Sequence, residues 1–278
     1  MILVAGGTGR LGSLVVHDLV ARGLDVRVLT RDPARAAHLK GVATEVVTGD
    51  VRDRASLDAS MAGVTTVVSA VQGFAGPGRG SPASVDNRGN ANLVDAASSV
   101  GADVVLVSVV GASGDHPMEL FRAKHEAEEH LRTSGRPWTI VRATAFVELW
   151  AEILAKGIIF GRGDNPINFV AVADVAAVVV RATVDQELRG QVLEVGGPED
   201  LTFNELAGIV RESRNGPKTF RHIPRWVLRA MSPVSRQPRA ALVMDRIDLR
   251  FDAHAAEGNR LLAKTDVRTA LGSARETA

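Results

Sequence analysis

Short apolar runs alternate with segments of helical spacing along the first half of the chain. The runs are nearly continuous in hydrophobic residues, and they lie at Ile2–Ala5, Val26–Leu29, Thr44–Val47, Thr65–Ser69, Val104–Ser108 and Thr139–Val141. Such runs are typical of parallel strands that are buried on both faces of a sheet. Between them, apolar residues fall on one helical stripe in Arg10–Arg22, Asp86–Val100 and Glu119–Ser134. Six alternations of this kind predict a doubly wound α/β sheet with right-handed crossovers.

Shorter elements follow after about residue 145. The pattern predicts a helix at Asp174–Val184 and strands at Ile158–Phe160, Phe169–Val172 and Gln191–Val195. A further helix begins after Thr202, because Glu205 stands three residues later in the spacing of a capping box. We therefore predict a larger domain at residues 1–145 and a smaller lobe at residues 146–278, which can interleave with the first domain.

The charges of the chain nearly cancel. Its 278 residues include 33 Lys and Arg against 32 Asp and Glu, which leaves a net charge of +1. This balance gives no reason to expect nucleic acid or an anionic membrane as partner. No apolar run reaches the roughly 18 residues of a membrane span, and the first residues lack the basic segment of a signal peptide. We therefore expect a cytoplasmic protein.

Two residue types are absent from the sequence. Without cysteine, the chain cannot form disulfides, thiolate nucleophiles, cysteine-bound zinc or iron–sulfur clusters. Without tyrosine, no mechanism can use a phenol as its proton donor. We also predict no metal site. His125 and His130 stand five residues apart, about 140° around a helix, so they cannot share one metal ion.

A glycine-rich turn, GGTGRLG at residues 6–12, lies between the first predicted strand and the first predicted helix. Gly6 permits a tight turn, Gly9 lets a pyrophosphate approach the backbone, and Gly12 lets the helix pack closely on the strand. The start of the helix offers unpaired N–H groups and a partial positive charge. The turn therefore predicts a dinucleotide site, to which we also assign Thr8, Arg10 and Leu11. The alternative is a strand–helix turn without a ligand.

Two arginines favour NADP(H) over NAD(H) as the dinucleotide. Arg31 follows the second strand, where an acidic ribose-binding residue is expected, and Arg10 lies within the glycine turn. Guanidinium groups match the geometry of a 2′-phosphate and stay charged. The alternative is Asp32, whose carboxylate would hold the 2′-hydroxyl of NAD.

Residues after the third and fourth strands complete the predicted cofactor site. Asp50 lies where the adenine is expected, and its carboxylate can accept the adenine amino group; the alternative is an N-cap of the next helix. Val51 and Ala70 are assigned to the same site. The segment Gly73–Ser84, rich in Gly, Pro and Ser, is either a lid over the cofactor or a plain connection.

Five segments point to a known family. They are the glycine turn, Thr30–Pro33, Gly49-Asp50, Phe121–Lys124 and Thr139–Phe146. Together they resemble the atypical short-chain dehydrogenases, and most closely the NmrA-like branch with its isoflavone-reductase-like enzymes and certain quinone reductases. The resemblance covers most of the chain and weakens after about Gly216. It implies a Rossmann domain, NADP(H) binding and usually reductase activity, although some members bind the cofactor without catalysis.

The sequence departs from the wider superfamily at the Tyr-x-x-x-Lys dyad, because Leu120 stands four residues before Lys124. The resemblance implies that Lys124 contacts the nicotinamide ribose and, in some branches, assists proton transfer. The alternative is an exposed lysine paired with Glu128. The resemblance also places a substrate-orienting serine at Ser108, where the alternative is an ordinary hydroxyl at a strand end. His116, in the loop before this helix, is a further candidate proton donor.

A basic stretch, Arg211–Arg250, holds ten Lys and Arg against three Asp and Glu. Two interpretations remain open, a set of solvated helix faces or a surface for a protein partner.

We predict from these features an NADPH-dependent oxidoreductase that transfers hydride to a small, apolar, conjugated substrate such as a quinone, an enone or an aromatic ketone. The proton would come from solvent, Lys124 or His116. The substrate pocket would lie at the carboxyl ends of the strands, lined by Phe74, Ser108, Thr144, Phe146 and Phe169. The alternative is a non-catalytic NADP(H)-binding regulator that senses redox state and acts through a protein partner.

Overall fold

A computed structural model of the chain describes residues 1–39, 41–73, 80–212, 217–252 and 259–273. Its main sheet has eight strands in the order β13-β10-β6-β5-β4-β1-β2-β3. Their bounds are Ile2–Ala5 (β1), Val26–Thr30 (β2), Glu45–Thr48 (β3), Thr66–Ser69 (β4), Asp103–Val109 (β5), Trp138–Ala143 (β6), Gln191–Gly196 (β10) and Asn259–Leu262 (β13). The strand order reverses between β1 and β4, which confirms the doubly wound, Rossmann-type α/β fold.

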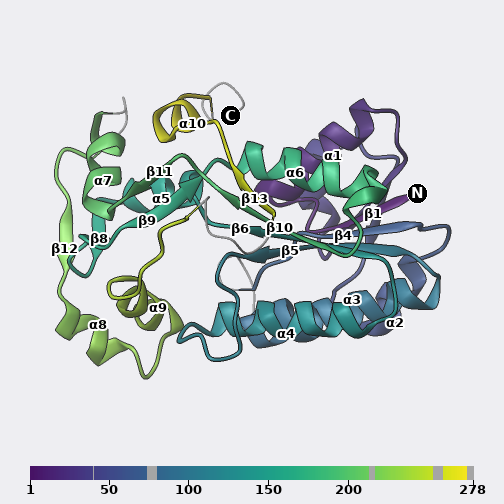
Figure 1. Cartoon of the computed structure of the whole chain (residues 1–278), viewed down its shortest axis with the longest axis horizontal. Helices are drawn as coiled ribbons and strands as arrows, with labels where there is room; N and C mark the ends of the chain where they lie inside the picture. The colour runs from purple at the N-terminus through teal and green to yellow at the C-terminus, as the bar shows by residue number, and fades with distance from the viewer. Residues whose placement is uncertain (40, 74–79, 213–216, 253–258, 274–278) are drawn as a thin grey trace. The chain divides into compact units, whose positions relative to one another are not determined.

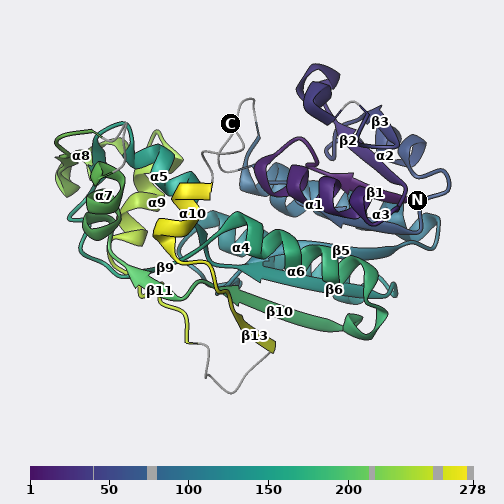
Figure 2. The same ribbon diagram turned by 90° about the horizontal axis from the view of Figure 1, so that it is seen from above.

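Strands β1 to β5 run parallel, with β1 paired to β2 on one side and to β4 on the other. Their side chains are mostly buried on both faces, as in β1, where all four residues are buried. Helices cover both faces (Figure 1, Figure 2). One face carries α1 (Arg10–Ala21) and α6 (Val172–Val184), and the other carries α2 (Arg54–Ser60), α3 (Arg88–Ser99) and α4 (Glu119–Thr133).

The chain forms two compact units. The first comprises Met1–Arg142 and Val175–Glu194, and the second comprises Ala143–Asp174 and Val195–Ala278. Most of α6 and β10 therefore belongs to the first unit, although both follow residue 146 in the sequence. The predicted dinucleotide site lies wholly within the first unit.

The second unit contains two small sheets, β11-β9-β7 and β12-β8. Its strands are Ala145–Phe146 (β7), Ile158–Phe160 (β8), Ile167–Val170 (β9), Glu199–Leu201 (β11) and Arg221–Ile223 (β12). Its helices are Val147–Leu154 (α5), Phe203–Glu212 (α7), Arg225–Met231 (α8), Arg236–Met244 (α9) and Val267–Ser273 (α10). The predicted capping box is present at α7, because the Glu205 amide donates to Thr202 Oγ1 at 3.1 Å and the Thr202 amide donates to Glu205 Oε2 at 2.8 Å.

Several predicted boundaries differ from the observed ones, and the difference before α6 has a tertiary cause. The strand expected at Phe169–Val172 ends at Val170, and the helix expected from Asp174 begins at Val172. The amide of Val172 donates to both carboxylate oxygens of Glu148, at 3.0 and 3.2 Å. An N–H group of the first turn of α6, which has no partner within its own helix, is thus bound by a residue of a different helix, α5. Local sequence patterns do not reveal such a contact.

Three short helical segments connect the main elements. Two are 3₁₀ turns, Pro33–Leu39 (η1) and Gln186–Leu188 (η3), and one is a π-helical turn, Pro82–Asn87 (η2), immediately before α3. The helix predicted at Asp86–Val100 therefore has an irregular first part. Among the helices of the described residues, none is both long and apolar enough to cross a membrane.

Candidate cofactor and active site

The glycine turn sits where the strand order reverses, between β1 and β4. Gly6 has a φ of +84°, and a Cβ atom there would lie 2.6 Å from the carbonyl oxygen of Ala70. A Cβ atom on Gly12 would overlap the carbonyl oxygen of Gly6, so the helix and the turn meet without room for a side chain. Gly9 differs, because a Cβ there would meet only the Gly6 oxygen, at 3.2 Å, among the described residues. Gly6 and Gly12 therefore pack tightly against the protein backbone, whereas Gly9 has room beside it, as a pyrophosphate site requires.

Helix α1 begins directly after Gly9, its N-cap, and no side chain caps its first turn. The first turn contains no acidic residue. The start of α1 therefore presents the positive end of the helix dipole to an anion. Arg10 is exposed at this end, whereas Leu11 is 8% exposed and can contribute only its backbone.

The sequence prediction missed Gly7. A Cβ atom at this position would lie 3.0 Å from Cγ1 of Val28 in the neighbouring strand β2. The doubled glycine in the motif was the signal that could have identified it.

The two candidate residues after β2 have different surroundings. The Asp32 carboxylate accepts the amide of Ala34 at 3.0 Å at the start of η1. It therefore has a local structural role of the kind that Asp commonly has at a turn. Arg31 is exposed, and its charge helps to lower the pKa of Asp50. The Arg31 side chain thus shares the electrostatic environment of the predicted adenine end of the site.

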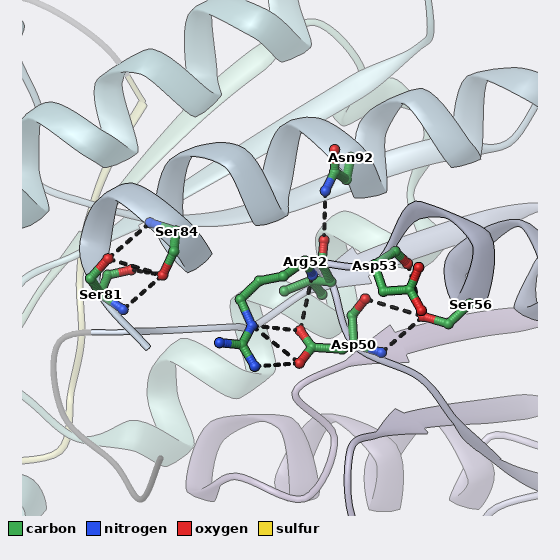
Figure 3. A network of polar contacts seen from close by, with 8 residues as sticks. Asp50, Arg52, Asp53, Ser56, Ser81, Ser84 and Asn92 are labelled. Atoms are coloured by element: carbon green, nitrogen blue, oxygen red, sulfur yellow. Dashed lines mark hydrogen bonds and ion pairs between the residues drawn. The ribbon is translucent and has the colours of Figure 1, made fainter. Parts of the chain in front are cut away.

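Asp50 is bound by Arg52, a residue that the sequence prediction missed (Figure 3). Asp50 Oδ1 accepts the Arg52 amide at 2.9 Å, and the two side chains form an ion pair with an Nη2–Oδ2 distance of 2.6 Å. The hydrogen bond from the Arg52 side chain is the largest cause of the lowered Asp50 pKa. The N-cap interpretation of Asp50 is wrong, because Asp53 caps α2 by accepting the Ala55 amide at 3.2 Å.

Val51 and Ala70 belong to the backbone framework around the turn. Val51 is buried, and its carbonyl oxygen accepts a hydrogen bond from Asn92 Nδ2 at 3.0 Å (Figure 3). The Ala70 amide donates to the carbonyl of Ala5 at 2.9 Å and so extends the pairing of β1 and β4. Val51 is thus tied to α3 through its backbone, whereas Ala70 extends the strand pairing beside the glycine turn.

Lys124 is buried, with only 4% of its surface exposed. Its Nζ atom donates to the carbonyl oxygens of Val71 at 3.1 Å and Val107 at 3.0 Å, and it lies 3.2 Å from Asp86 Oδ1. The alternative of an exposed lysine paired with Glu128 is therefore wrong. Two backbone carbonyls thus accept hydrogen bonds from the ammonium group, and the Asp86 carboxylate supplies its counter-charge. The two carbonyls lie at the carboxyl ends of β4 and β5, where α/β proteins place their sites.

Further buried polar residues lie near the ends of β4 and β5, and sequence reasoning found only Ser108 among them. Ser69 at the end of β4 donates to Asn90 Oδ1, and Asn90 Nδ2 donates to the Asp86 carbonyl at 2.7 Å. Ser108 is 2% exposed, and its hydroxyl has no hydrogen-bond partner within the described part of the chain. A buried hydroxyl without a partner is unusual. It fits a position where a bound molecule would supply the partner.

His116 lies in the loop before α4. Its Nδ1 accepts the Met118 amide at 3.1 Å, and its ring stacks on Phe121 with a centroid distance of 4.0 Å. Burial lowers the His116 pKa. Because Nδ1 accepts this hydrogen bond, the neutral ring carries its proton on Nε2.

The predicted substrate-pocket residues of the second unit have structural contacts of their own. Phe169 is 1% exposed and packs near Phe203 with a centroid distance of 6.1 Å, which gives no support to its place on a pocket wall. Thr144 Oγ1 donates to Asn168 Oδ1 at 2.8 Å, and Phe146 is partly buried. Phe74 lies outside the described residues, as does half of the segment predicted to be a lid or a connection.

Comparison with known proteins agrees with this geometry. Residues 6–186 match the model of the NAD(P)H-binding family. The chain belongs to this family. It is 30% identical to the NAD(P)H azoreductase of Xenophilus azovorans over 226 residues, which are 79% of this chain and 76% of that protein. It is 33% identical to the (4-alkanoyl-5-oxo-2,5-dihydrofuran-3-yl)methyl phosphate reductase of Streptomyces griseus over 230 residues, 80% of this chain and 77% of that protein.

Solved structures share the fold of this NAD(P)H-binding protein. The triphenylmethane reductase of Citrobacter in complex with NADP(H) has a TM-score of 0.75 and 20% identity, with coverage of 99% and 100% of the two chains. The NADPH-dependent quinone oxidoreductase of Escherichia coli with NADPH has a TM-score of 0.69 and 22% identity, with coverage of 89% and 92%. The predicted family and the predicted class, NAD(P)H-dependent reductase, are confirmed.

Proposed function

We propose that this protein is an NADPH-dependent reductase that transfers hydride to a small, apolar, conjugated substrate. The observation that carries the proposal is the arrangement at the carboxyl ends of β1, β4 and β5. There, the open glycine turn, the buried Lys124 ammonium and the unpaired Ser108 hydroxyl belong to one unit. When bound, the reduced nicotinamide supplies the hydride. The glycine turn suits a diphosphate, because Gly9 has room beside its backbone and lies at the start of α1.

The absence of tyrosine and the surroundings of Lys124 and His116 support a substrate that needs little acid catalysis. Lys124 donates to two backbone carbonyl oxygens and pairs with the Asp86 carboxylate, and burial lowers the pKa of His116. Neither side chain is arranged as a strong proton donor. Conjugated acceptors suit this site, because their reduced forms are stabilised enolates or hydroquinones that take a proton readily from water. The relatives named above are reductases, and none of them supports a regulatory role.

A substrate panel tests this proposal. The purified protein would be mixed with NADPH and, separately, a quinone, an enone, an aromatic ketone and an unconjugated aliphatic ketone, while nicotinamide absorbance is followed. We expect consumption of NADPH with at least one conjugated acceptor and none with the aliphatic ketone. Tight NADPH binding without turnover on any conjugated acceptor would contradict the reductase proposal. Faster turnover of the aliphatic ketone would contradict the substrate class.

The surroundings of Arg31 and Asp32 support NADPH over NADH. The Asp32 carboxylate already caps η1, whereas Arg31 is exposed close enough to Asp50 to affect its pKa. A guanidinium group at this position suits the 2′-phosphate of NADP(H). A carboxylate would instead repel that phosphate.

Arg31→Ala is expected to weaken NADPH binding about tenfold, the loss of one charge-assisted phosphate contact of about 1.4 kcal/mol. NADH binding should stay within twofold, because NADH lacks the 2′-phosphate. Calorimetric titration of both nucleotides measures the ratio. The matched control is Arg22→Ala, which removes an exposed arginine at the opposite end of α1. An unchanged NADPH-to-NADH ratio in Arg31→Ala would show that the 2′-phosphate is held elsewhere.

A further inference from the structure

Asp86 is the counter-ion of Lys124 and is completely buried, with 0% of its surface exposed. Its Oδ1 lies 3.2 Å from Lys124 Nζ, and its Oδ2 accepts the amide of Gly73 at 2.8 Å. One carboxylate therefore joins α4, which carries the lysine, to the chain just after β4. The sequence motifs gave no role to Asp86.

An uncommon local structure positions Asp86 beside Lys124. It lies in η2, the π-helical turn that begins after the Ser81 cap (Figure 3). Ser81 Oγ accepts the Ser84 amide at 3.1 Å, and Ser84 Oγ accepts the Ser81 amide at 2.9 Å, so the turn is held at its start. A π-helical turn holds one more residue than an α-helical turn, and such turns are frequent at functional sites.

Stability alone does not account for the Asp86–Lys124 pair. Burial raises the pKa of Asp86, and the charge of Lys124 opposes this shift. Two buried ions carry a desolvation cost that their attraction often only balances, and well-packed apolar residues of similar volume are often as stabilising. A buried pair at the carboxyl ends of β4 and β5 therefore suggests a use for the fixed positive charge.

We propose that Asp86 is a positioning residue that holds the Lys124 ammonium at the carboxyl ends of β4 and β5, where it binds the cofactor. The inference rests on the proposed function. When the cofactor binds, Lys124 can exchange its hydrogen bond to the Val71 or Val107 carbonyl for one to a hydroxyl of the bound molecule, because both carbonyls are neutral acceptors. The Asp86 carboxylate is the charged contact and stays in place when one of them is exchanged. Asp86 acts through Lys124 and touches no ligand itself.

The experiment is a double-mutant cycle read out by NADPH affinity. Asp86→Asn, Lys124→Met and the double variant would be titrated with NADPH by calorimetry. Asp86→Asn and Lys124→Met are each expected to weaken NADPH binding about tenfold. The double variant should bind no more weakly than Lys124→Met, because Asp86 has no effect once its lysine is absent. The KM for a quinone at saturating NADPH should stay within twofold in Asp86→Asn.

The control is Asp95→Asn, which removes an exposed carboxylate on α3 that contacts His130 at 2.7 Å. NADPH affinity should not change in this variant. If Asp86→Asn does not fold, the double variant and Lys124→Met still decide the question, because neither leaves a buried ammonium unpaired. Equal NADPH affinity of these two variants shows that Asp86 does not act on the cofactor independently of Lys124, and a further tenfold loss in the double variant overturns the proposal.

Failure of this inference is distinguishable from failure of the proposed function. If the unaltered protein binds NADPH and reduces a conjugated acceptor while Asp86→Asn has the same NADPH affinity, only the role of Asp86 is wrong. If the unaltered protein neither binds NADPH nor consumes it, the proposed function is wrong, and the role of Asp86 falls with it.

Discussion

Gly12→Ala is expected to weaken NADPH binding at least a hundredfold and to lower the melting temperature. The added methyl group would overlap the Gly6 carbonyl oxygen and lie 2.8 Å from the Gly7 Cα, both of them backbone atoms of the turn. Backbone cannot move aside as the end of a long side chain can, so α1 must shift away from the turn. That shift displaces the helix N-terminus, whose amides would bind the diphosphate. Calorimetric titration with NADPH and thermal unfolding measure the two effects.

Gly208→Ala is the matched control for this prediction. Gly208 lies within α7, and a Cβ atom there would meet nothing within 4 Å among the described residues. The substitution should leave NADPH affinity unchanged and raise stability by about 0.5–1 kcal/mol, because alanine loses less backbone entropy in a helix. If Gly12→Ala bound NADPH as tightly as Gly208→Ala does, the glycine turn would not be the diphosphate site.

Glu128→Ala is expected to lower the free energy of unfolding by about 3 kcal/mol. The Glu128 side chain has 0% exposure and accepts two hydrogen bonds from Arg142, one of them at 2.9 Å from Nε. It also lies 3.1 Å from Arg132 Nη2. Without this carboxylate, the Arg142 guanidinium keeps only its contact with Glu194, at 3.1 Å, of the ion pairs described here. A poorly compensated charge beside α4 and β6 destabilises the folded state.

The neighbouring residue provides the control. Glu129 also binds Arg132, but its side chain is 53% exposed. Because solvent screens such a pair, Glu129→Ala should cost no more than about 0.5 kcal/mol. Urea unfolding of the two variants compares the removal of one carboxylate from adjacent positions of the same helix. Equal losses of stability would contradict the view that Glu128 anchors α4, the helix that carries Lys124 one turn earlier.

Local sequence patterns were sufficient for the first strand and the first helix of the chain. The strand β1 and the helix α1 begin at Ile2 and Arg10, where the predicted segments Ile2–Ala5 and Arg10–Arg22 begin. Both starts can be predicted from the spacing of hydrophobic residues and the position of the glycines. The roles of Gly6 and Gly12 were also predictable, since a turn that lacks room for a Cβ atom demands glycine wherever it occurs. The start of α6 was not, because its first amide binds Glu148 from another helix.

The burial and the ion-pair partner of each charged side chain could be assigned only from the tertiary structure. The same lysine is compatible, in sequence, with an exposed pair with Glu128 and with a buried contact to Asp86. The first partner is one helical turn away, whereas the second is 38 positions away on a separate segment (124 − 86 = 38). Asp50 shows the same limit at short range, since two acidic residues three positions apart could each cap α2, and only Asp53 does so.

The sequence by itself determined the alternation of strands and helices in the first half of the chain, the glycine turn at the end of β1 and the exclusion of thiol and phenol chemistry. These depend on residue type and on spacing within a few positions of the chain. Only the tertiary structure decided that Lys124 is buried, that Asp86 is its counter-ion and that Arg142 bridges Glu128 and Glu194. The pairing of a buried charge depends on which segments pack against it, and those segments are brought together by the sheet as a whole.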